Sequence, residues 1–236
     1  MTTYQVAITG SDRGLGLELC KAFARGGHTV FAGQYMPDAD SLAELQQQYP
    51  NTVFPIALDC ASDVSIKHFV GETYKHTPRL EILLNNAAVL GDIETGIAST
   101  LDFDEMQKVF NINALGPLRL VNALLPLLKA GSRKRIAYIS SEAASISENF
   151  RDRWFAYCMS KAALNRQAAL IHEALKSEDF SVLCLHPGHL RTHMRGELDE
   201  SASLTAEAVA KPLMELILNP PKSFGFWDFE GKEMGW

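Results

Sequence analysis

Short apolar runs recur along the chain, and they alternate with segments whose apolar residues have helical spacing. Seven runs of five to seven residues are rich in β-branched and aromatic side chains, which favours strands. Because these runs are apolar almost throughout, rather than at every second position, we expect the strands to be buried on both faces. The expected strands cover residues 5–9, 29–33, 52–58, 81–85, 135–140, 181–187 and 223–229.

Each of the first six runs is followed by a segment that predicts a helix. In residues 15–27 the apolar side chains recur at intervals of three and four, and the pair Gly26 and Gly27 supplies a stop. The other expected helices cover residues 38–49, 61–75, 104–130, 155–177 and 205–218. This alternation predicts an α/β protein with a parallel sheet of about seven strands and helices on both faces. Right-handed crossovers then give a Rossmann-type doubly wound fold, with residues 1–236 as a single domain.

Composition and charge narrow the classes of partner. Of the 236 residues, 47% are hydrophobic, enough for a sizeable core, and the net charge of −6 gives no hint of a nucleic-acid partner. No run approaches the roughly 18 apolar residues of a membrane span, and the first residues do not resemble a signal peptide. Cys20, Cys60, Cys158 and Cys184 have no paired spacing, so we expect reduced thiols in a cytoplasmic protein without a membrane partner.

The stretch TGSDRGLG, residues 9–16, joins the first expected strand to the first helix. Gly10 suits a tight turn, Gly14 leaves room for a pyrophosphate, and Gly16 lets the helix pack close to the strand. The helix N-terminus adds free N–H groups and a positive dipole end, which bind phosphate. The spacing differs from G-x-G-x-x-G, so a glycine-rich turn without a ligand stays open as an alternative.

Four polar residues at expected strand ends and on expected helices indicate acid–base chemistry. Tyr157 and Lys161 lie four positions apart and share one helix face, where the ammonium is expected to lower the pKa of the phenol. Ser141 follows a strand whose carboxyl end faces the ligand crevice, where a hydroxyl can bond a substrate oxygen. Asn113 lies mid-helix, where it indicates a kink or a bound water. Taken singly, each of these residues could instead be an ordinary polar residue that is exposed on a helix or forms a loop.

Taken together and in this order, these stretches resemble the short-chain dehydrogenase/reductase family over essentially the whole chain. TGSDRGLG is similar to its cofactor loop, and NNAA at residues 85–88 is similar to its Asn-Asn-Ala-Gly motif. NALG from Asn113, ISS ending at Ser141 and YCMSK from Tyr157 resemble its catalytic stretches. PGHLRT at 187–192 resembles its Pro-Gly-x-x-x-Thr segment. YCMSKAALN and the tail GFWDFEGKEMGW resemble the C-factor-like and sniffer-like carbonyl reductase branch.

The resemblance implies an NAD(P)-dependent oxidoreductase that moves hydride between a nicotinamide and a small carbonyl or alcohol substrate. Tyr157 is then the general acid–base, and Lys161 lowers its pKa and holds the nicotinamide ribose. Ser141 binds the substrate oxygen and Asn113 supports a water-linked proton relay. The resemblance also implies a homodimer or homotetramer built from the helices at 102–130 and 155–177.

The resemblance further implies a set of cofactor-binding residues. Within it, Asp59 contacts adenine and Thr192 contacts the carboxamide, while Asn85 orders the centre of the sheet. The full set is Gly10, Ser11, Arg13, Gly14, Leu15, Gly16, Gln34, Asp59, Cys60, Asn86, Ala87, Ala88, Tyr157, Lys161, Pro187, Gly188 and Thr192.

The end of the second strand decides between the two nicotinamide cofactors. NAD binders place an acid there for the ribose 2′-hydroxyl, whereas a basic residue accommodates the 2′-phosphate of NADP. Here the position holds Gln34, where the branch often has Arg, and Asp38 comes late enough to begin the next helix. Arg13 in the glycine loop matches a basic position of NADPH-preferring relatives. NADP(H) is therefore favoured over NAD(H).

Two further departures from the family pattern concern the site itself. Ala88 stands where a Gly is usual, so a methyl group next to the cofactor is expected to tighten that turn. Ser141 and Tyr157 are 16 positions apart, longer than the family's usual separation, and the extra stretch SENFRDRW is expected to reshape the substrate rim. We expect substrate selection in residues 89–96, 144–154 and 188–201, which must meet at the strand ends.

Other interpretations stay open beside this one. His189, His193 and Glu197 recur at intervals of four, as metal ligands on a helix do, but they lack the adjacent Glu of H-E-x-x-H, so no metal is expected. An epimerase or dehydratase of the same fold would use bound nicotinamide without net turnover. A nucleotide-sensing or signalling protein would keep the fold with a vestigial site.

Overall fold

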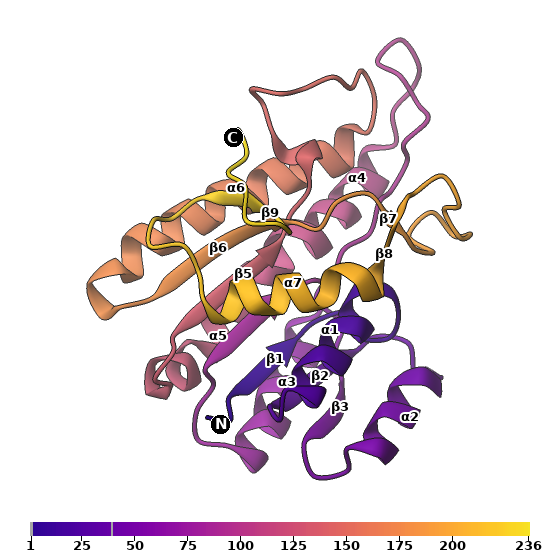
Figure 1. Ribbon diagram of the computed structural model, residues 1–236. Coiled ribbons are helices and arrows are strands. Elements are labelled where there is room, and N and C mark those ends of the chain that lie inside the picture. The colour runs from indigo at the N-terminus through magenta and orange to yellow at the C-terminus, as the bar shows by residue number, and fades with distance from the viewer. Residues whose placement is uncertain (1, 39) are drawn as a thin grey trace.

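The computed structural model describes residues 2–38 and 40–236, and its main feature is one parallel sheet (Figure 1). The strand order is β3-β2-β1-β4-β5-β6-β9, so this is the doubly wound Rossmann-type sheet that the sequence predicts. The strands are β1 (Gln5–Ile8), β2 (Thr29–Gln34), β3 (Val53–Ala57), β4 (Ile82–Asn85), β5 (Arg135–Ile139), β6 (Ser181–His186) and β9 (Phe226–Asp228).

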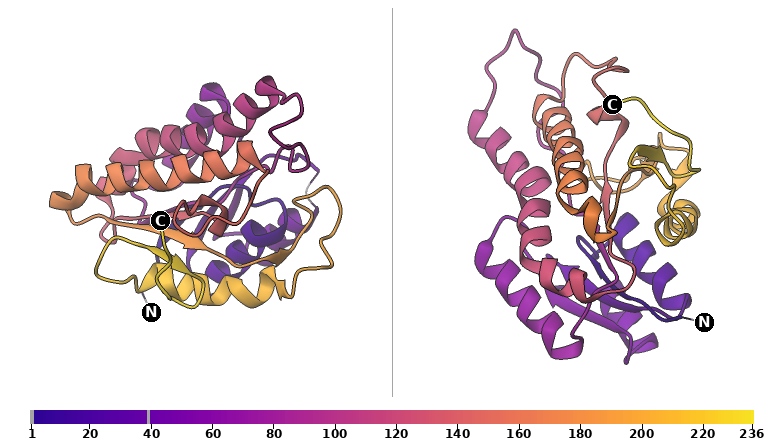
Figure 2. Two further views of the ribbon diagram at one scale, coloured as in Figure 1. Left: turned by 90° about the horizontal axis from the view of Figure 1, so that it is seen from above. Right: turned by 90° about the vertical axis from the view of Figure 1, so that its left-hand side faces the viewer.

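Helices cover both faces of this sheet, as the two views of Figure 2 show. On one face lie α1 (Gly14–Arg25), α2 (Asp40–Gln48) and α7 (Ala206–Leu218). On the other lie α3 (Asp63–His76), α5 (Gly116–Ala130) and α6 (Phe155–Leu175), with α4 (Phe103–Phe110) packed against α6. None of the helices in residues 2–38 and 40–236 is both long enough and apolar enough to cross a bilayer.

Each strand contributes to two separate cores because its side chains alternate between the faces. In β1, Val6 and Ile8 pack with α1 and α7, whereas Ala7 packs with α3 and α5 on the opposite face. All three side chains are fully buried, which explains the continuous apolar run in the sequence.

The strands added after β1 lie on one side of it and those from β4 onward lie on the other, so a crevice forms between the loops that follow β1 and β4. From β1 the sheet grows one way through β2 and β3, and the other way through β4, β5 and β6. In open α/β sheets, ligands bind outside the carboxyl ends of the strands at such a point. The loops after β1 and β4, which carry the predicted glycine and NNAA motifs, therefore meet there.

The structure differs from the predicted elements in four places. The single helix expected at 104–130 is α4, then a π-helical turn at Asn111–Leu115, then α5. The strand expected at 223–229 shortens to β9, and a two-stranded pair, β7 (Leu190–Arg191) with β8 (Leu204–Thr205), was not expected. Helix α2 begins at Asp40 rather than Asp38; the intervening residue 39 of that expected helix lies outside the described residues.

Candidate active site

A cavity of about 830 Å³ opens at the carboxyl ends of the strands. Its wall includes the glycine loop after β1, the loops after β4, β5 and β6, and Tyr157. A volume of this size is typical of sites for a ligand as large as a dinucleotide or a cofactor with substrate. The three segments expected to select substrate, 89–96, 144–154 and 188–201, all contribute residues to its wall.

The glycine loop has positive φ angles and a close backbone contact that residues with a side chain would not permit. Gly10 and Gly14 have φ angles of +65° and +56°, in the region that side chains disfavour. A Cβ at Gly16 would lie 2.0 Å from the Gly10 carbonyl oxygen, so only glycine permits this close approach of α1 to the loop. Helix α1 begins at Gly14 with no side-chain cap and no acid in its first turn, which leaves its N–H groups free for an anion.

The loop after β4 is tied directly to the glycine loop. The hydroxyl of Thr9 accepts hydrogen bonds from the backbone N–H groups of Asn86 and Ala87, each 2.9 Å long. The side-chain amide of Asn86 donates to the carbonyls of Thr9 and Gly10, at 2.9 and 3.1 Å. These four bonds fix the two loops as one rigid rim of the cavity.

Tyr157 and Lys161 lie on the first turns of α6 and are both almost fully buried. The Lys161 ammonium lies 5.7 Å from the centre of the Tyr157 ring and donates a 2.8 Å hydrogen bond to the carbonyl of Ile139. Burial lowers the pKa of Lys161 to about 7, because the charged form is desolvated. The lysine is thus held at the catalytic end of the cavity by the last residue of β5.

Whether Lys161 lowers the pKa of Tyr157 stays a prediction. Burial of the phenol raises its pKa above the ordinary value, and a hydrogen bond with Ser141 offsets this only in part. The phenol therefore keeps its proton at neutral pH. A buried, protonated hydroxyl facing the cavity is suited to act as an acid toward an oxygen that gains negative charge.

We expect Lys161→Met to increase the free energy of unfolding at neutral pH while it removes activity. Between about pH 7 and pH 10.4 the unfolded chain binds a proton at Lys161 that the folded chain does not, so lowering the pH in this window destabilises the native protein. The lost hydrogen bond to Ile139 offsets only about 1 kcal/mol. Denaturant unfolding at pH 7 and pH 9.5 checks this. The stability gain of the variant should be larger at pH 7, and an equal difference at both pH values contradicts the assignment.

Asn113 lies in the π-helical turn between α4 and α5 and is buried. Its amide nitrogen donates to the Val89 carbonyl at 2.8 Å and to the Ser160 hydroxyl at 3.0 Å, and its oxygen accepts from the Val89 N–H at 2.9 Å. The kink that the sequence indicates is present, and π turns of this kind are frequent at functional sites. The side chain spans the loop after β4 and helix α6, so it positions both.

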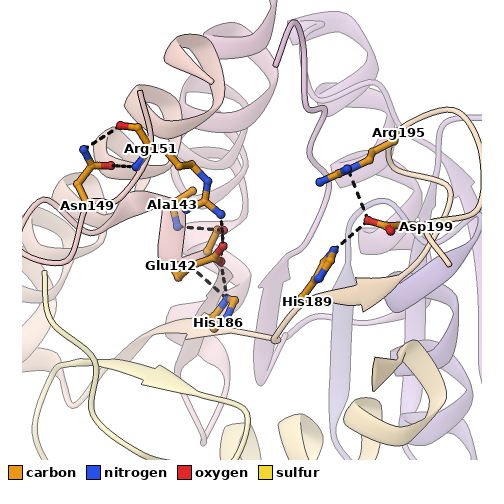
Figure 3. A network of polar contacts seen from close by, with 9 residues as sticks. Glu142, Ala143, Asn149, Arg151, His186, His189, Arg195 and Asp199 are labelled. Atoms are coloured by element: carbon orange, nitrogen blue, oxygen red, sulfur yellow. Dashed lines mark hydrogen bonds and ion pairs between the residues drawn. The ribbon is translucent and has the colours of Figure 1, made fainter. Parts of the chain in front are cut away.

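Ser141 follows β5 and is hydrogen-bonded to Glu142. Figure 3 shows the side chains of Glu142, Arg151 and His186, which form a network of polar contacts there. The Ser141 hydroxyl donates to the Glu142 carboxylate at 2.8 Å and accepts from the Ala143 N–H at 3.2 Å. The other carboxylate oxygen of Glu142 lies 2.5 Å from a guanidinium nitrogen of Arg151. Nδ1 of His186, at the end of β6, lies 3.3 Å from both the backbone nitrogen and the carboxylate of Glu142.

Arg151, which contacts Glu142, belongs to the long connection between Ser141 and Tyr157. The Arg151 guanidinium stacks between the rings of Phe150 and Trp154, at 4.3 and 4.8 Å from their centres. Trp154 has a φ of +64°, an uncommon conformation for a bulky residue, and its ring lies edge-on to Tyr157 at 6.1 Å. The added residues therefore reach the catalytic end of the cavity rather than staying at its outer rim.

A second polar group stands on the 188–201 side of the cavity (Figure 3). The Asp199 carboxylate contacts Nε2 of His189 at 2.9 Å and Nε of Arg195 at 3.4 Å. Hydrogen bonds from Ser201 and His189 lower the pKa of Asp199 to about 2. His189, His193 and Glu197 do not lie on one face of a helix, because β7 and turns occupy this segment. The His189 ring is hydrogen-bonded to Asp199.

Most of the predicted site residues line the one cavity, but three do not. The Ser11 hydroxyl is fully buried and donates to the Ile8 carbonyl, and the Gln34 amide donates to the carbonyls of Met36 and Pro37. Asn113 is the third predicted residue that does not line the cavity. Asn85, which was expected to order the centre of the sheet, is buried at the end of β4. The lining residues are Gly10, Arg13, Gly14, Leu15, Gly16, Asp59, Cys60, Asn86, Ala87, Ala88, Ser141, Tyr157, Lys161, Pro187, Gly188 and Thr192.

Sequence reasoning missed Glu142 and His186, which also line the cavity. Each stands next to a motif residue, Glu142 after Ser141 and His186 before Pro187. The available signal was a titratable residue close to the end of a buried strand at the crevice, since Glu142 comes three positions after β5 and His186 is the last residue of β6.

Comparison with known proteins assigns the family. A sequence model of the short chain dehydrogenases matches residues 5–203, so the chain belongs to this family. C-signal of Myxococcus xanthus is 37% identical over 168 residues, covering 68% of this chain and 95% of that protein. The 1-hydroxy-2-glutathionyl-2-methyl-3-butene dehydrogenase of Rhodococcus sp. (strain AD45) is 29% identical over 234 residues, covering 98% and 99%.

Solved structures place the chain in the carbonyl reductase branch of that family. The carbonyl reductase Sniffer of D. melanogaster has a TM-score of 0.92 at 25% identity, with 100% of both chains covered. The NADPH-bound carbonyl reductase from chicken fatty liver has a TM-score of 0.89 at 27% identity, again with 100% of both chains covered. Together with the family match, these neighbours support NAD(P)-dependent oxidoreduction.

Proposed function

We propose that this protein reduces a carbonyl compound to an alcohol with NADPH, with Tyr157 as the general acid. The observation that carries the proposal is the buried Tyr157 side chain in the wall of a cavity that also contains the uncapped N-terminus of α1. When bound, the reduced nicotinamide supplies the hydride. Tyr157 supplies the proton to the substrate oxygen, with the Ser141 hydroxyl beside it.

The glycine loop fits a dinucleotide pyrophosphate, because its glycines let α1 and the loop after β4 approach closely and the N–H groups at the start of α1 have no side-chain cap. Cβ atoms at Gly10 and Gly16 would meet Ala87 at 2.9 Å and the Gly10 carbonyl at 2.0 Å. We assign the pyrophosphate to the N–H groups from Gly14 onward, the adenine to Asp59, and the nicotinamide end to Thr192 and Lys161. Asn113 and Asn86 act by holding these loops in register.

NADPH is favoured over NADH because of the charges near the end of β2. The last residue of β2 is Gln34, whose amide is turned back onto the following loop, so it offers no carboxylate to a ribose 2′-hydroxyl. The carboxylate of Asp12 accepts from the Met36 N–H at 2.9 Å and fastens the two loops together. Arg13 is exposed and lines the cavity, as Tyr35 and Met36 do, and we expect it to receive the 2′-phosphate.

We expect Arg13→Ala to weaken NADPH binding and to leave NADH binding nearly unchanged. A charge-assisted contact with a phosphate contributes roughly 1.5–3 kcal/mol, which is about 10- to 100-fold in affinity. Titration of both reduced cofactors against the native protein and the variant measures this. Lys21→Ala, which removes a partly exposed cation further along α1, is the matched control. Equal losses for both cofactors would give Arg13 a structural role and undo the NADPH preference.

The cavity wall favours a mid-sized carbonyl substrate with an apolar part. Trp154, Leu90 and Met194 supply apolar surface, while Arg151 and Glu142 supply charge. An epimerase or dehydratase would convert its substrate without net oxidation of the cofactor. A nucleotide-sensing or signalling protein with a vestigial site would neither convert a substrate nor oxidise the cofactor. Loss of NADPH absorbance with a panel of carbonyl compounds, matched by alcohol formation, tests the proposed function against both alternatives.

We also propose a homodimer or homotetramer in the cytoplasm. Helices α5 and α6 and the turn before α5 carry exposed apolar side chains, namely Leu115, Leu118, Met159 and Leu170, which suit a contact between copies. The four cysteines are free thiols, which agrees with a reducing compartment.

A further inference from the structure

A second cavity of about 340 Å³ adjoins the active-site cavity, and the proposed reaction gives it no role. The two cavities share four wall residues, which are Phe150, Arg151, Trp154 and Arg195. The Trp154 ring lies edge-on to Tyr157, with the ring centres 6.1 Å apart. The second cavity therefore extends the site beside the proposed proton donor, where a substrate must lie.

The wall of the second cavity carries an excess of positive charge. Three arginines line it, Arg151, Arg153 and Arg195, against two acids, Glu94 and Asp152. The acid side chains are 82% and 90% exposed, and they lie 4.0 and 3.6 Å from Arg153. Ion pairs this exposed contribute little, because water and salt screen them. A cavity with this wall favours a ligand that has an anionic group.

Arg151 is already committed to other groups of the protein. A guanidinium nitrogen of Arg151 lies 2.5 Å from the Glu142 carboxylate, and the side chain is only 15% exposed. The same guanidinium stacks on the rings of Phe150 and Trp154. Figure 3 shows Arg151 and Glu142 on one side and Arg195 on the other. Arg151 is thus a fixed part of the wall whose charge Glu142 balances.

Arg195 has nitrogen atoms left for a ligand. Its Nε lies 3.4 Å from the Asp199 carboxylate, which also contacts the His189 ring and the Ser201 hydroxyl. Among the residues that the structure describes, no other acid pairs with this guanidinium, so both terminal nitrogens stay open. The side chain is 41% exposed, and Cζ lies 5.4 Å from the centre of the Trp154 ring. Such a planar fork of N–H groups matches a carboxylate.

We propose that the protein acts on carbonyl compounds that also carry a carboxylate, and that Arg195 binds this carboxylate in the second cavity. The inference rests on the proposed function and names its class of substrate. Trp154 lies between the two groups that the substrate must reach, since its ring contacts both Tyr157 and Arg195. The carbonyl and the carboxylate are therefore joined by an apolar spacer, for which the indole offers a surface.

The experiment compares aldehydes that differ in charge but hardly in size. The first pair is 4-formylbenzoate and 4-formylbenzamide, and the second is 4-(4-formylphenyl)butanoate and its primary amide. In the longer pair the saturated spacer insulates the aldehyde from the change of charge. With NADPH and the native protein, we expect kcat/KM to be higher for the acid than for the amide in at least one pair, by on the order of tenfold. This preference should shrink in about 1 M salt, which screens a half-exposed ion pair.

Substitutions at Arg195 show whether it provides the preference. Arg195→Gln should remove it, whereas Arg195→Lys should keep part of it, because an ammonium retains the charge without the planar fork. Arg25→Gln, at an exposed arginine in the last turn of α1 and outside both cavities, is the matched control and should keep all of it. The ratio of the two kcat/KM values is independent of how much of a preparation is folded, so partial unfolding does not obscure the result.

Three results overturn the proposal. The native protein could use acid and amide equally in both pairs, or a preference for the acid could survive unchanged in Arg195→Gln. Arg195→Gln could also lose NADPH affinity and keep the preference, which would assign the arginine to the cofactor. A native protein that oxidises NADPH with the amides but shows no preference for the acids refutes this inference alone. A native protein that oxidises no NADPH with any carbonyl compound refutes the proposed function, and the inference with it.

Discussion

Tyr157→Phe should lower turnover by about 10²- to 10⁴-fold and leave NADPH affinity almost unchanged. The variant removes the buried hydroxyl that we propose as the proton donor, while the ring keeps its packing against Leu90 and Trp154. We expect most of the contacts that hold the cofactor to come from the glycine loop rather than from Tyr157. Turnover and NADPH binding are measured on the same preparations.

The packing role of the ring makes a stability control necessary. The hydroxyl gives up hydrogen bonds to water when it is buried, so the change to Phe is not expected to lower the melting temperature. A variant that keeps a tenth or more of native turnover would remove Tyr157 from the acid role. A variant that loses NADPH binding to the same extent as turnover would make the residue part of the cofactor site alone.

Gly16→Ala should abolish measurable cofactor binding, with a loss of at least about 100-fold. The new methyl group would lie 2.0 Å from the Gly10 carbonyl oxygen and 2.6 Å from the Asn86 amide nitrogen, so the backbone itself must move. That movement breaks the bond between Asn86 and Gly10 and displaces the N–H groups at the start of α1. Binding of NADPH is measured by titration, together with the melting temperature.

Gly71→Ala is the matched control for this substitution. Gly71 lies inside α3 with ordinary backbone angles, and a Cβ there would meet nothing within 4 Å. Because alanine is the better helix former, this variant should gain roughly 0.5–1 kcal/mol and bind NADPH normally. If Gly16→Ala binds NADPH as the control does, the glycine loop does not hold the cofactor in the way that its geometry indicates.

The fold could be predicted because its signals are local. Continuous apolar runs such as residues 81–85 are buried on both faces of the sheet, and the alternation with helices determines the winding. The tight turn of the glycine loop could also be predicted, since Gly10 and Gly14 adopt backbone angles that few other residues tolerate. These features depend on residues close together in the chain.

The parts of the site that the sequence did not reveal depend on contacts between distant residues. Glu142, Arg151 and His186 come from three separate elements, so nothing in their spacing indicates a network. The sequence shows that Lys161 is one turn from Tyr157, but it does not show that the phenol is buried, and burial raises the pKa of Tyr157. Gln34 stands at the expected strand end, yet its side chain folds back onto the loop, which only the three-dimensional arrangement determines.

The most direct measurement follows deuterium from C4 of reduced nicotinamide into the product. The native protein is incubated with a carbonyl compound and NADPH deuterated at C4, separately in the 4R and 4S positions, and the alcohol is analysed by mass spectrometry. One of the two isomers should give an alcohol with one deuterium on the former carbonyl carbon, formed in a one-to-one ratio with oxidised cofactor. An alcohol that lacks deuterium from both isomers, or a panel of carbonyl compounds that oxidises no NADPH, would contradict a carbonyl reductase.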